Sequence, residues 1–357
     1  MPALTFPDND PLLRKQWVAE TDYVAEQKMV AARYFGSGGD AAFRIRDNLN
    51  KGYGREVVWS AAFPLVGKGT VGLERLKDKE EQPTLRSDSM RIDMSRHAVP
   101  VGTKIDAQLA PTNLRKIGRD GLGSWKAKQV DKACANHLCG YTVANTDTSD
   151  LGSTQRGHNT IVAPAASRHI RAGGIATDEL VAADSTAKIT LELIDICKER
   201  AMLETSTEWP IEPLSGGKHI MFIHPSQFTD LRRNEEWQAI QLAALAGKNE
   251  GNPLYKYALG EYNDTILVPW AYITPGVNST TGVAVSNTRR AVFCGAEALS
   301  IAWGRNYDGG SGDWTEDKDD YGMHMYVAYD LMWGVKANMY NSTDYAKIVV
   351  TTYSATH

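Results

Sequence analysis

The amino-acid sequence predicts a folded protein of the α+β class. Helical and strand-like patterns are mixed along its 357 residues, without the regular alternation of a doubly wound α/β fold. We find no internal repeat. Hydrophobic residues make up 42% of the chain and charged residues 23%, a balance typical of proteins that bury a core. The length predicts two or three structural units.

Composition excludes several classes of protein. The net charge of −4 and the pI of about 6.1 show no basic excess of the kind that binds nucleic acid or membranes. No apolar run approaches the roughly 18 residues of a membrane span, and the start MPALTFPDNDPLLRK lacks the pattern of a secretory signal. The cysteines are too sparse for a disulfide framework and suit a reducing cytoplasm: Cys134, Cys139, Cys197 and Cys294.

The first fifty or so residues are polar and are interrupted by prolines and by the turn at Gly36–Gly39. We expect two short helices within them, at about 10–35 and 40–49. Such a segment has too little apolar surface for a core of its own. We therefore expect it to be frayed or held against another surface.

The next region predicts two long strands joined by a polar tip. Val57, Trp59 and Ala61 share one face of the first strand, and Met90 and Ile92 alternate with charged residues in the second. The tip, residues 67–88, carries glycines followed by mixed charge. An isolated two-stranded ribbon is marginal in water. It is either a hairpin folded onto its own domain or, as we favour, an arm that reaches a neighbouring subunit.

A helical pattern follows from Ile105 to about Leu138, and Pro111 suits its first turn. Three glycines interrupt this pattern, and each costs about 1 kcal/mol relative to alanine in a helix. We therefore predict a bend or a break there, with the firmer helix at 124–138. The glycines are Gly118, Gly121 and Gly123.

The second half of the chain alternates irregular segments with short elements. We predict irregular connections with one or two short helices over 145–184, and then a helix from Asp184 with Ile189, Leu193, Ile196 and Cys197 on its apolar face. The other expected elements are a strand at 219–224, a helix from Pro225 to near Gly247, strands at 265–270 and 290–293, an acidic loop at 304–322 and strands over 323–352.

Residues 67–72 match the G-x-G-x-x-G pattern of dinucleotide-binding folds and follow a strand. That pattern also needs a helix after the glycines and a buried parallel strand beyond. Here Pro83 cuts short the helix-like segment, and the next strand alternates its charges as an exposed ribbon does. We interpret the glycines as flexible residues at the edge of the loop.

Three other groups could suggest chemistry. Cys134 and Cys139 flank His137, but on a helix the two cysteines point about 140° apart, so we expect buried small residues rather than a zinc site. His219 and His224 face opposite sides of a strand. The acidic loop has no register of a calcium-binding EF-hand, so we expect a solvated loop with at most weak cation binding: Asp308, Asp313, Glu316, Asp317, Asp319 and Asp320. We predict no catalytic residue, cofactor or metal, and no enzyme.

The order of segments along the chain resembles a known family. The strand VVWSAAFPL precedes the charged tip, the arm ending at Arg96–Val99 and the helix with Trp125 and Asp131. Then come FIHPSQFTDLRR, the Asn252-Pro253-Leu254 stretch with Gly260, RRAVFCGAEAL, Asp320-Tyr321-Gly322 and NSTDYAKIVVTT. Over about residues 40–352 this order resembles the coat proteins of tailed phages typified by the podovirus N-four.

The resemblance implies the Hong Kong ninety-seven capsid fold and a role for each region. The regions are an N-terminal arm at 1–51, an extended loop at 52–101, a peripheral domain with its spine helix at 102–184, an axial domain at 185–322, and C-terminal strands at 323–357 that return to the peripheral domain. The protein would be a major capsid protein whose pentamers and hexamers form an icosahedral shell around the double-stranded DNA of a tailed phage.

The resemblance also implies the binding partners of the protein and its location. The subunit would bind copies of itself, a separate scaffolding protein, a portal and decoration proteins, without a membrane. It would be assembled in the bacterial host cytoplasm and reside in the virion capsid. Some relatives join subunits through lysine–asparagine bonds, but we predict none for Lys68, Lys77 or Lys79. The alternatives are the shell of a cellular nanocompartment with the same fold and a soluble α+β metabolic enzyme.

Overall fold

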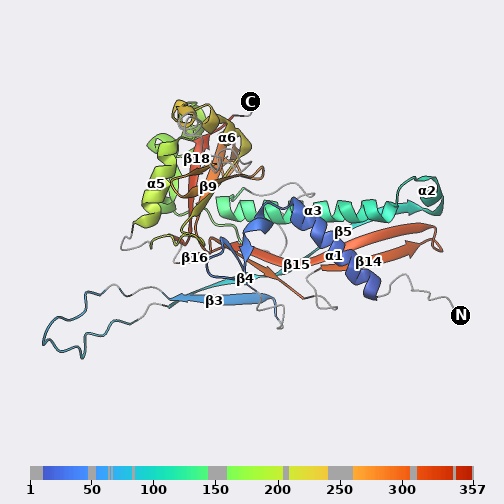
Figure 1. The fold of residues 1–357 in the computed structure, drawn as a ribbon, viewed down its shortest axis with the longest axis horizontal. Helices are drawn as coiled ribbons and strands as arrows, with labels where there is room; N and C mark the ends of the chain where they lie inside the picture. The colour runs from blue at the N-terminus through green and yellow to red at the C-terminus, as the bar shows by residue number, and fades with distance from the viewer. Residues whose placement is uncertain are drawn as a thin grey trace, which may run out of the picture.

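The structure is a computed structural model. It describes residues 11–46, 54–62, 65, 67–82, 85–143, 159–203, 209–239, 260–305, 312–340 and 343–355. These residues form a compact unit, an elongated unit that extends from its base, and a thin ribbon that projects in the opposite direction (Figure 1).

The elongated unit is a long helix, α3 (Leu114–Cys139), laid along a six-stranded sheet (Figure 1). The sheet runs β1-β2-β13-β15-β14, with β5 also paired to β15. Its strands are β1 (Phe35–Gly36), β2 (Phe43–Ile45), β5 (Asp93–Thr103), β13 (Leu299–Trp303), β14 (Gly312–Asp319) and β15 (His324–Ala337).

Helix α1 (Pro11–Lys28) packs on α3 and β14 of the same chain and leads into a 3₁₀ turn at Ala31–Tyr34. Trp17 of α1 stacks on Trp314 of β14, with ring centroids 5.7 Å apart. The first segment is therefore held against a surface of its own subunit. At the far end of the unit lies the short helix α2 (Lys104–Leu109), which begins with a capping box formed by Thr103 and Asp106 (Figure 1).

The compact unit is a second six-stranded sheet with the order β6-β18-β12-β7-β9-β8. Apolar side chains fill its central strands, in which Val349, Val350, Val292 and Phe293 are fully buried. The strands are β6 (His169–Arg171), β7 (His219–Ile223), β8 (Glu261–Tyr262), β9 (Thr265–Pro269), β12 (Thr288–Cys294) and β18 (Lys347–Tyr353). Around this sheet lie the helices α4 (Asp178–Ala183), α5 (Leu191–Met202) and α6 (Pro225–Arg232), with 3₁₀ turns at Ala166–Arg168 and Ala172–Gly174. Two short strand pairs complete the unit: β10 (Gly276–Val277) with β11 (Ala284–Val285), and β16 (Met339–Tyr340) with β17 (Thr343–Asp344).

The ribbon consists of β3 (Glu56–Ala62) and β4 (Leu85–Arg91), paired antiparallel along their whole lengths. The expected strand pair is confirmed, but its second strand is shorter than predicted. Residues 93–103, expected in the ribbon up to 101, form β5 and pair with β15 in the sheet of the elongated unit. The chain crosses from ribbon to sheet at Ile92, which is buried.

The long helix runs without a break through the glycines at which we predicted a bend or a break, and close packing explains these glycines. A Cβ at Gly123 would lie 3.0 Å from the Thr21 carbonyl oxygen of α1, and one at Gly118 would lie 3.0 Å from Val327 of β15. Both glycines let neighbouring elements approach α3, so the packing offsets their low helix propensity.

The caps of two helices differ from the predictions. Asn113 caps α3 by accepting from two backbone N–H groups, so Pro111 precedes the helix instead of lying in its first turn. Asp184, the predicted start of a helix, instead ends α4, and α5 begins at Leu191 with Thr190 as its cap. The expected apolar face of that helix is confirmed for Leu193 and Cys197, which are buried.

Two further predictions of local structure were wrong. Residues 43–45, expected in a helix, form β2 and pair with β13; residues 312–319, expected in a loop, form β14 and pair with β15. Sheet pairing overrides the polar character of β14, which buries Trp314 on one face and exposes most of its charged side chains. The helix from Pro225 ends at Arg232, and its expected end near Gly247 lies outside the described residues.

The sheets divide the chain differently from the expected boundaries. β13 and β14, placed by the sequence within 185–322, belong to the sheet of the elongated unit, whereas β18, expected to return to that unit, lies in the compact sheet. The strands predicted at 219–224, 265–270 and 290–293 are confirmed as β7, β9 and β12. None of the described helices is long and apolar enough to cross a membrane.

Candidate assembly surfaces

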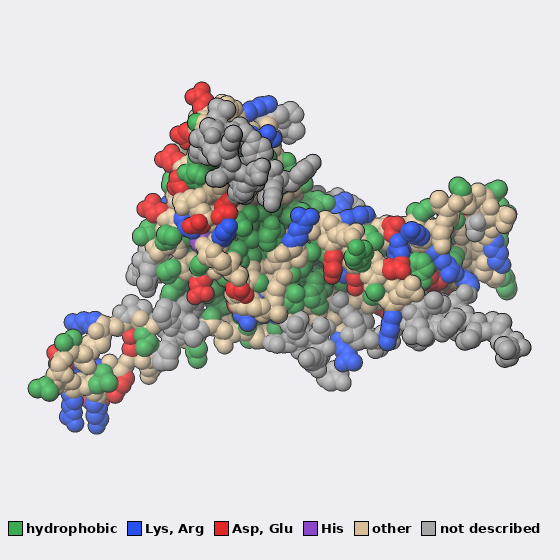
Figure 2. All heavy atoms as spheres, in the orientation of Figure 1, with side chains coloured by type: hydrophobic (Ala, Val, Ile, Leu, Met, Phe, Trp, Pro, Cys, Tyr) green, Lys and Arg blue, Asp and Glu red, His purple; other side chains and the backbone are tan. Residues whose placement is uncertain are grey.

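The ribbon carries an irregular loop, residues 65–82 in their described part, which we call the extended loop. Its apolar side chains face solvent: Val71 is 81% exposed and Leu73 fully exposed. Figure 2 shows hydrophobic, basic and acidic side chains interspersed over the loop. A loop with exposed apolar side chains and no core of its own favours contact with another molecule.

The base of the ribbon is fixed to the body of the subunit. Val57 and Trp59 of β3 form a buried cluster with Met90, Ala302 and Tyr340. Such a cluster anchors the ribbon, while β3–β4 pairing holds the extended loop away from the rest of the subunit (Figure 1). The subunit is therefore built to present the loop at a distance.

A second surface lies at the far end of the elongated unit, where the β14–β15 turn meets α2. Tyr321 in this turn is fully exposed and has φ +51°, a left-handed conformation that is unfavourable for a bulky residue. Ile105 and Leu109 of α2 are also largely exposed. A cavity of about 760 Å³ lies beside them, lined by residues that include Lys104, Asn113, Arg115, Lys318, Tyr321 and Met325.

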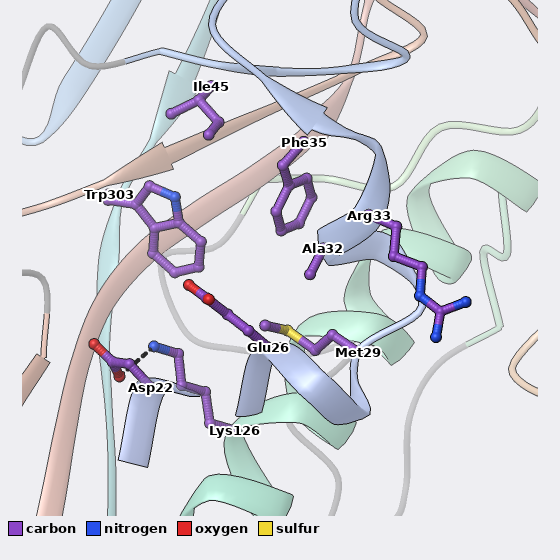
Figure 3. Close-up of a pocket in the computed structure, with 9 residues that line it drawn as sticks. All are labelled: Asp22, Glu26, Met29, Ala32, Arg33, Phe35, Ile45, Lys126 and Trp303. Carbon is purple, nitrogen blue, oxygen red and sulfur yellow. Dashed lines mark hydrogen bonds and ion pairs between the residues drawn. The ribbon is translucent and has the colours of Figure 1, made fainter. Parts of the chain in front are cut away.

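A third surface is an open cavity of about 460 Å³ bordered by α1, α3 and the sheet of the elongated unit (Figure 3). Phe35 and Trp303 provide its aromatic wall. Asp22 and Lys126 form an ion pair at its edge, with an Oδ1–Nζ distance of 2.8 Å. Glu26 points toward the indole of Trp303, and its carboxylate has no hydrogen bond or ion pair to any described residue (Figure 3).

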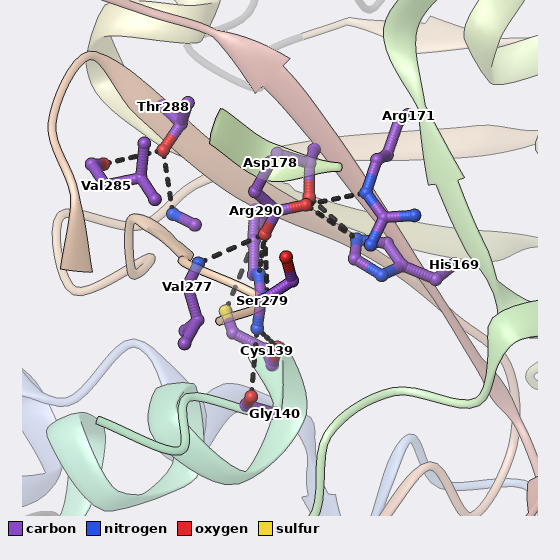
Figure 4. Close-up of polar contacts among 12 residues, drawn as sticks. Cys139, Gly140, His169, Arg171, Asp178, Val277, Ser279, Val285, Thr288 and Arg290 are labelled. Carbon is purple, nitrogen blue, oxygen red and sulfur yellow. Dashed lines mark hydrogen bonds and ion pairs between the residues drawn. The ribbon is translucent and has the colours of Figure 1, made fainter. Parts of the chain in front are cut away.

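The joint between the two units is a buried polar network at the C-terminal end of α3 (Figure 4). Arg290 of β12 donates from Nη1 to the carbonyl oxygens of Cys139 (3.2 Å) and Gly140 (2.9 Å), and from Nη2 to Asp178 (2.7 Å). Lys347 of β18 donates to the carbonyls of His137 and Leu138, each at 3.0 Å. Two cations of the compact sheet thus satisfy the last carbonyls of the helix and oppose its negative dipole end.

The charges of this network compensate one another. Burial alone would raise the pKa of Asp178, but the charge of Arg290 and a hydrogen bond from Arg171 hold that pKa below its usual value. Burial, and then the charge of Arg171, lowers the pKa of His169 to about 3. The imidazole is therefore neutral at pH 7, and its Nε2 lies 2.8 Å from Thr351 Oγ1.

A family model described as phage capsid protein matches residues 5–356. The chain belongs to this family. The capsid protein of Ralstonia phage GP4 has a similar structure, with 24% identity, 99% of each chain covered and a TM-score of 0.76. The capsids of cyanophage Pam1 (15%, 100% of each chain, 0.71) and Helicobacter pylori bacteriophage KHP40 (16%, 90% of this chain and 89% of that one, 0.62) are also similar. No curated protein sequence matches.

The predicted fold class and the role of a phage major capsid protein are confirmed. The capsid protein has the α+β Hong Kong ninety-seven fold that the resemblance implied. The family match favours a phage capsid over the shell of a cellular nanocompartment, and it places the protein among the structural proteins of the virion.

The glycine and cysteine motifs singled out in the sequence occupy structural positions in the capsid protein. Gly69 and Gly72 have positive φ in irregular backbone of the extended loop. Cys134 and Cys139 are fully buried on α3, and Cys139 Sγ lies 3.4 Å from the Arg290 carbonyl oxygen. Burial raises the pKa of both thiols. The described residues contain no group of three or more side chains arranged to hold a metal.

The histidines and acidic residues also lie apart from one another. His219 is buried beside Lys198, with Nδ1 3.2 Å from Nζ, whereas His224 caps α6 through Ser226. Asp313, Glu316, Asp317 and Asp319 lie on β14 and Asp320 lies in the turn after it, while Asp308 lies outside the described residues. Sequence reasoning missed the cavity at Glu26 and the capping of α3. A signal for the capping was available, because the charged Arg290 and Lys347 directly precede the apolar runs 291–294 and 348–350.

Proposed function

We propose that the capsid protein assembles into hexamers and pentamers that close an icosahedral shell around the double-stranded DNA of a tailed phage. The observation that carries this proposal is the extended loop, which the ribbon holds away from its own subunit with its leucines exposed. Burying a leucine or valine side chain contributes about 1.5–3 kcal/mol. Contact with the adjacent subunit would supply that burial.

Closed symmetry turns modest contacts into a stable shell. Each subunit would contribute its loop to one neighbour and receive a loop from another, so every contact repeats around the ring. Several such contacts act together once a ring has formed, because each further contact becomes intramolecular.

In this arrangement the compact unit and the elongated unit would each correspond to a domain of the capsid fold. The compact unit would be the axial domain, which meets its copies around five-fold and six-fold axes. The elongated unit with α3 would be the peripheral domain with its spine helix. Residues 1–51 would form the N-terminal arm, within which α1 packs on α3 of its own subunit.

The remaining partners follow from the same role. We infer that a separate scaffolding protein, a portal and decoration proteins act with the subunit, that assembly takes place in the bacterial host cytoplasm, and that the protein has no catalytic activity. A net charge of −4 suits a container, because a strongly basic wall would bind the phosphates of the packaged DNA.

Deleting Gly69 to Gln82 tests the role of the extended loop. The shortened subunit should keep its far-ultraviolet circular dichroism and cooperative melting, because the deleted residues lie outside the buried cluster at the ribbon base. It should form few or no closed particles. If the deletion unfolds the subunit, the loop belongs to the subunit's own core and the proposal is wrong.

A further inference from the structure

The cavity beside α1 is suited to a positively charged side chain. Its lining combines the indole of Trp303 and the phenyl ring of Phe35 with the carboxylate of Glu26 (Figure 3). A carboxylate supplies the counter-charge for a cation, and aromatic faces attract cations through their quadrupole. Trp303 already has one cation near its ring, since Lys126 Nζ lies 5.5 Å from the ring centroid.

Of the four charged side chains that line the cavity, Asp22 and Lys126 pair with each other, which leaves Glu26 and Arg33. Asp22 is engaged by Lys126 and also accepts a hydrogen bond of 2.5 Å from the Tyr329 hydroxyl. Arg33 lines the rim, but its guanidinium points away from the aromatic wall (Figure 3). Glu26 therefore gives the open part of the cavity a negative character.

The extended loop carries the complementary chemistry. Arg75 and Lys77, on either side of the exposed Leu76, make no hydrogen bond or ion pair with any described residue. Leu73, close by, is fully exposed. By contrast, Lys79 is paired with Glu74 at 2.9 Å. The apex at 73–77 thus presents two unpaired cations beside apolar side chains.

The loop of a subunit cannot fill that subunit's own cavity. β3 and β4 are paired from Glu56–Arg91 to Ala62–Leu85, and this ribbon directs the apex away from α1 (Figure 1). The occupant must then come from a second copy of the chain. Each subunit carries both a loop apex with unpaired basic side chains and a cavity with an unpaired carboxylate and aromatic side chains. In a ring, the apex of one subunit would bind the cavity of the next, head to tail.

We propose that the cavity at Glu26 receives a basic side chain, Arg75 or Lys77, from the extended loop of the adjacent subunit. This inference rests on the proposed function and names the place where the loop binds. Its consequence is that the N-terminal helix α1 forms part of the docking site, so an N-terminal segment and a distant loop act together in each contact.

Charge reversal and its rescue test the proposal on the full-length chain, produced with the other head proteins of its phage. Glu26→Lys should lower the yield of closed particles about tenfold or more, as expected for a repulsive pair in a buried contact. Arg75→Glu or Lys77→Glu should do the same. Combining Glu26→Lys with the matching reversal should restore most of the yield. Particle yield is measured by sedimentation and electron microscopy.

Matched controls separate docking from folding. Glu199→Lys on the exposed face of α5 should assemble like the wild type, and all variants should keep the wild-type melting temperature as unassembled subunits.

The outcomes distinguish this inference from the proposed function. If Glu26→Lys assembles normally, or if its defect is rescued by neither loop reversal, the docking proposal is wrong; the second result would point to a separate basic partner. If the wild-type protein itself forms no rings or particles, the proposed function fails first.

Discussion

Single residues decide how the two units of the capsid protein are joined. Lys347 is fully buried, and besides the carbonyls of His137 and Leu138 it contacts Asp344, which is also fully buried, at 3.3 Å. A buried cation is tolerated here because two carbonyl oxygens accept its hydrogen bonds and a carboxylate balances its charge. Removing it leaves a buried carboxylate and two helix carbonyls without their cation.

Lys347→Met should therefore destabilise the unassembled subunit by about 3 kcal/mol or more. The control Lys79→Met removes a cation from an exposed pair in the extended loop and should change stability by less than about 1 kcal/mol. Urea unfolding followed by tryptophan fluorescence measures both. Equal effects of the two substitutions would show that Lys347 does not hold α3 against the compact sheet.

The same network predicts sensitivity to acid. The pKa of His169 is lowered to about 3 in the folded subunit but is about 6.5 in the unfolded chain. The unfolded chain binds the proton first, so stability is complete above pH ~6.5 and falls as the pH drops toward 3. Asp178, whose pKa is also lowered, loses its contribution below its unfolded value of about 3.8.

His169→Gln should flatten the loss of stability between about pH 6.5 and 4, a loss on the order of a few kcal/mol in the wild type. Part of the slope should persist, because burial also lowers the pKa of His224 to about 4. Thermal melting across this pH range provides the measurement, and an unchanged slope in His169→Gln would contradict the account.

Among the elements, α3 shows how packing overrides helix propensity. Gly121 has no atom within 4 Å of a would-be Cβ, whereas Gly123 lies against Thr21 and Val24 of α1. Gly121→Ala should stabilise the subunit by about 0.5–1 kcal/mol. Gly123→Ala should destabilise it by about 1–3 kcal/mol, because α1 must move away. Urea unfolding of the two variants gives the comparison; stabilisation by both would mean that α1 is not closely packed on α3.

The elements that could be predicted from the sequence are those whose pattern is local. The apolar run at 219–223 and the Pro225 helix start carry their own signals, as does the alternation at Val57 and Trp59. Segments whose structure depends on distant partners could not be predicted. β14 is polar. It forms a strand only because it pairs with β15, to which the turn at Tyr321 connects it.

The same difference between local and distant signals decides which assembly surfaces could be predicted from the sequence. The extended loop was visible in the sequence because glycine and mixed charge separate two strands. The cavity at Glu26 was not, because it combines α1 with Trp303, which is nearly 280 residues away in the chain. Because these side chains come together only in the folded subunit, their spacing along the sequence gives no pattern that would identify the cavity.

At the scale of the whole molecule, the capsid protein is a body with a projecting ribbon rather than a closed globule. The extended loop and the β14–β15 turn lie at its opposite ends (Figure 1). Each carries an exposed apolar group, Leu73 on the loop and Tyr321 in the turn. A protein that acts as a monomer would gain nothing from this exposure. The shape therefore requires neighbours, and the shell supplies them.

Electron microscopy of the purified full-length protein, produced with the other head proteins of its phage, tests this central claim most directly. We expect polyhedral particles, or rings of five and six subunits, and double-stranded DNA inside particles taken from infected cells. A discrete dimer or tetramer at every concentration would contradict the account, and particles that enclose enzymes instead of DNA would contradict its phage part.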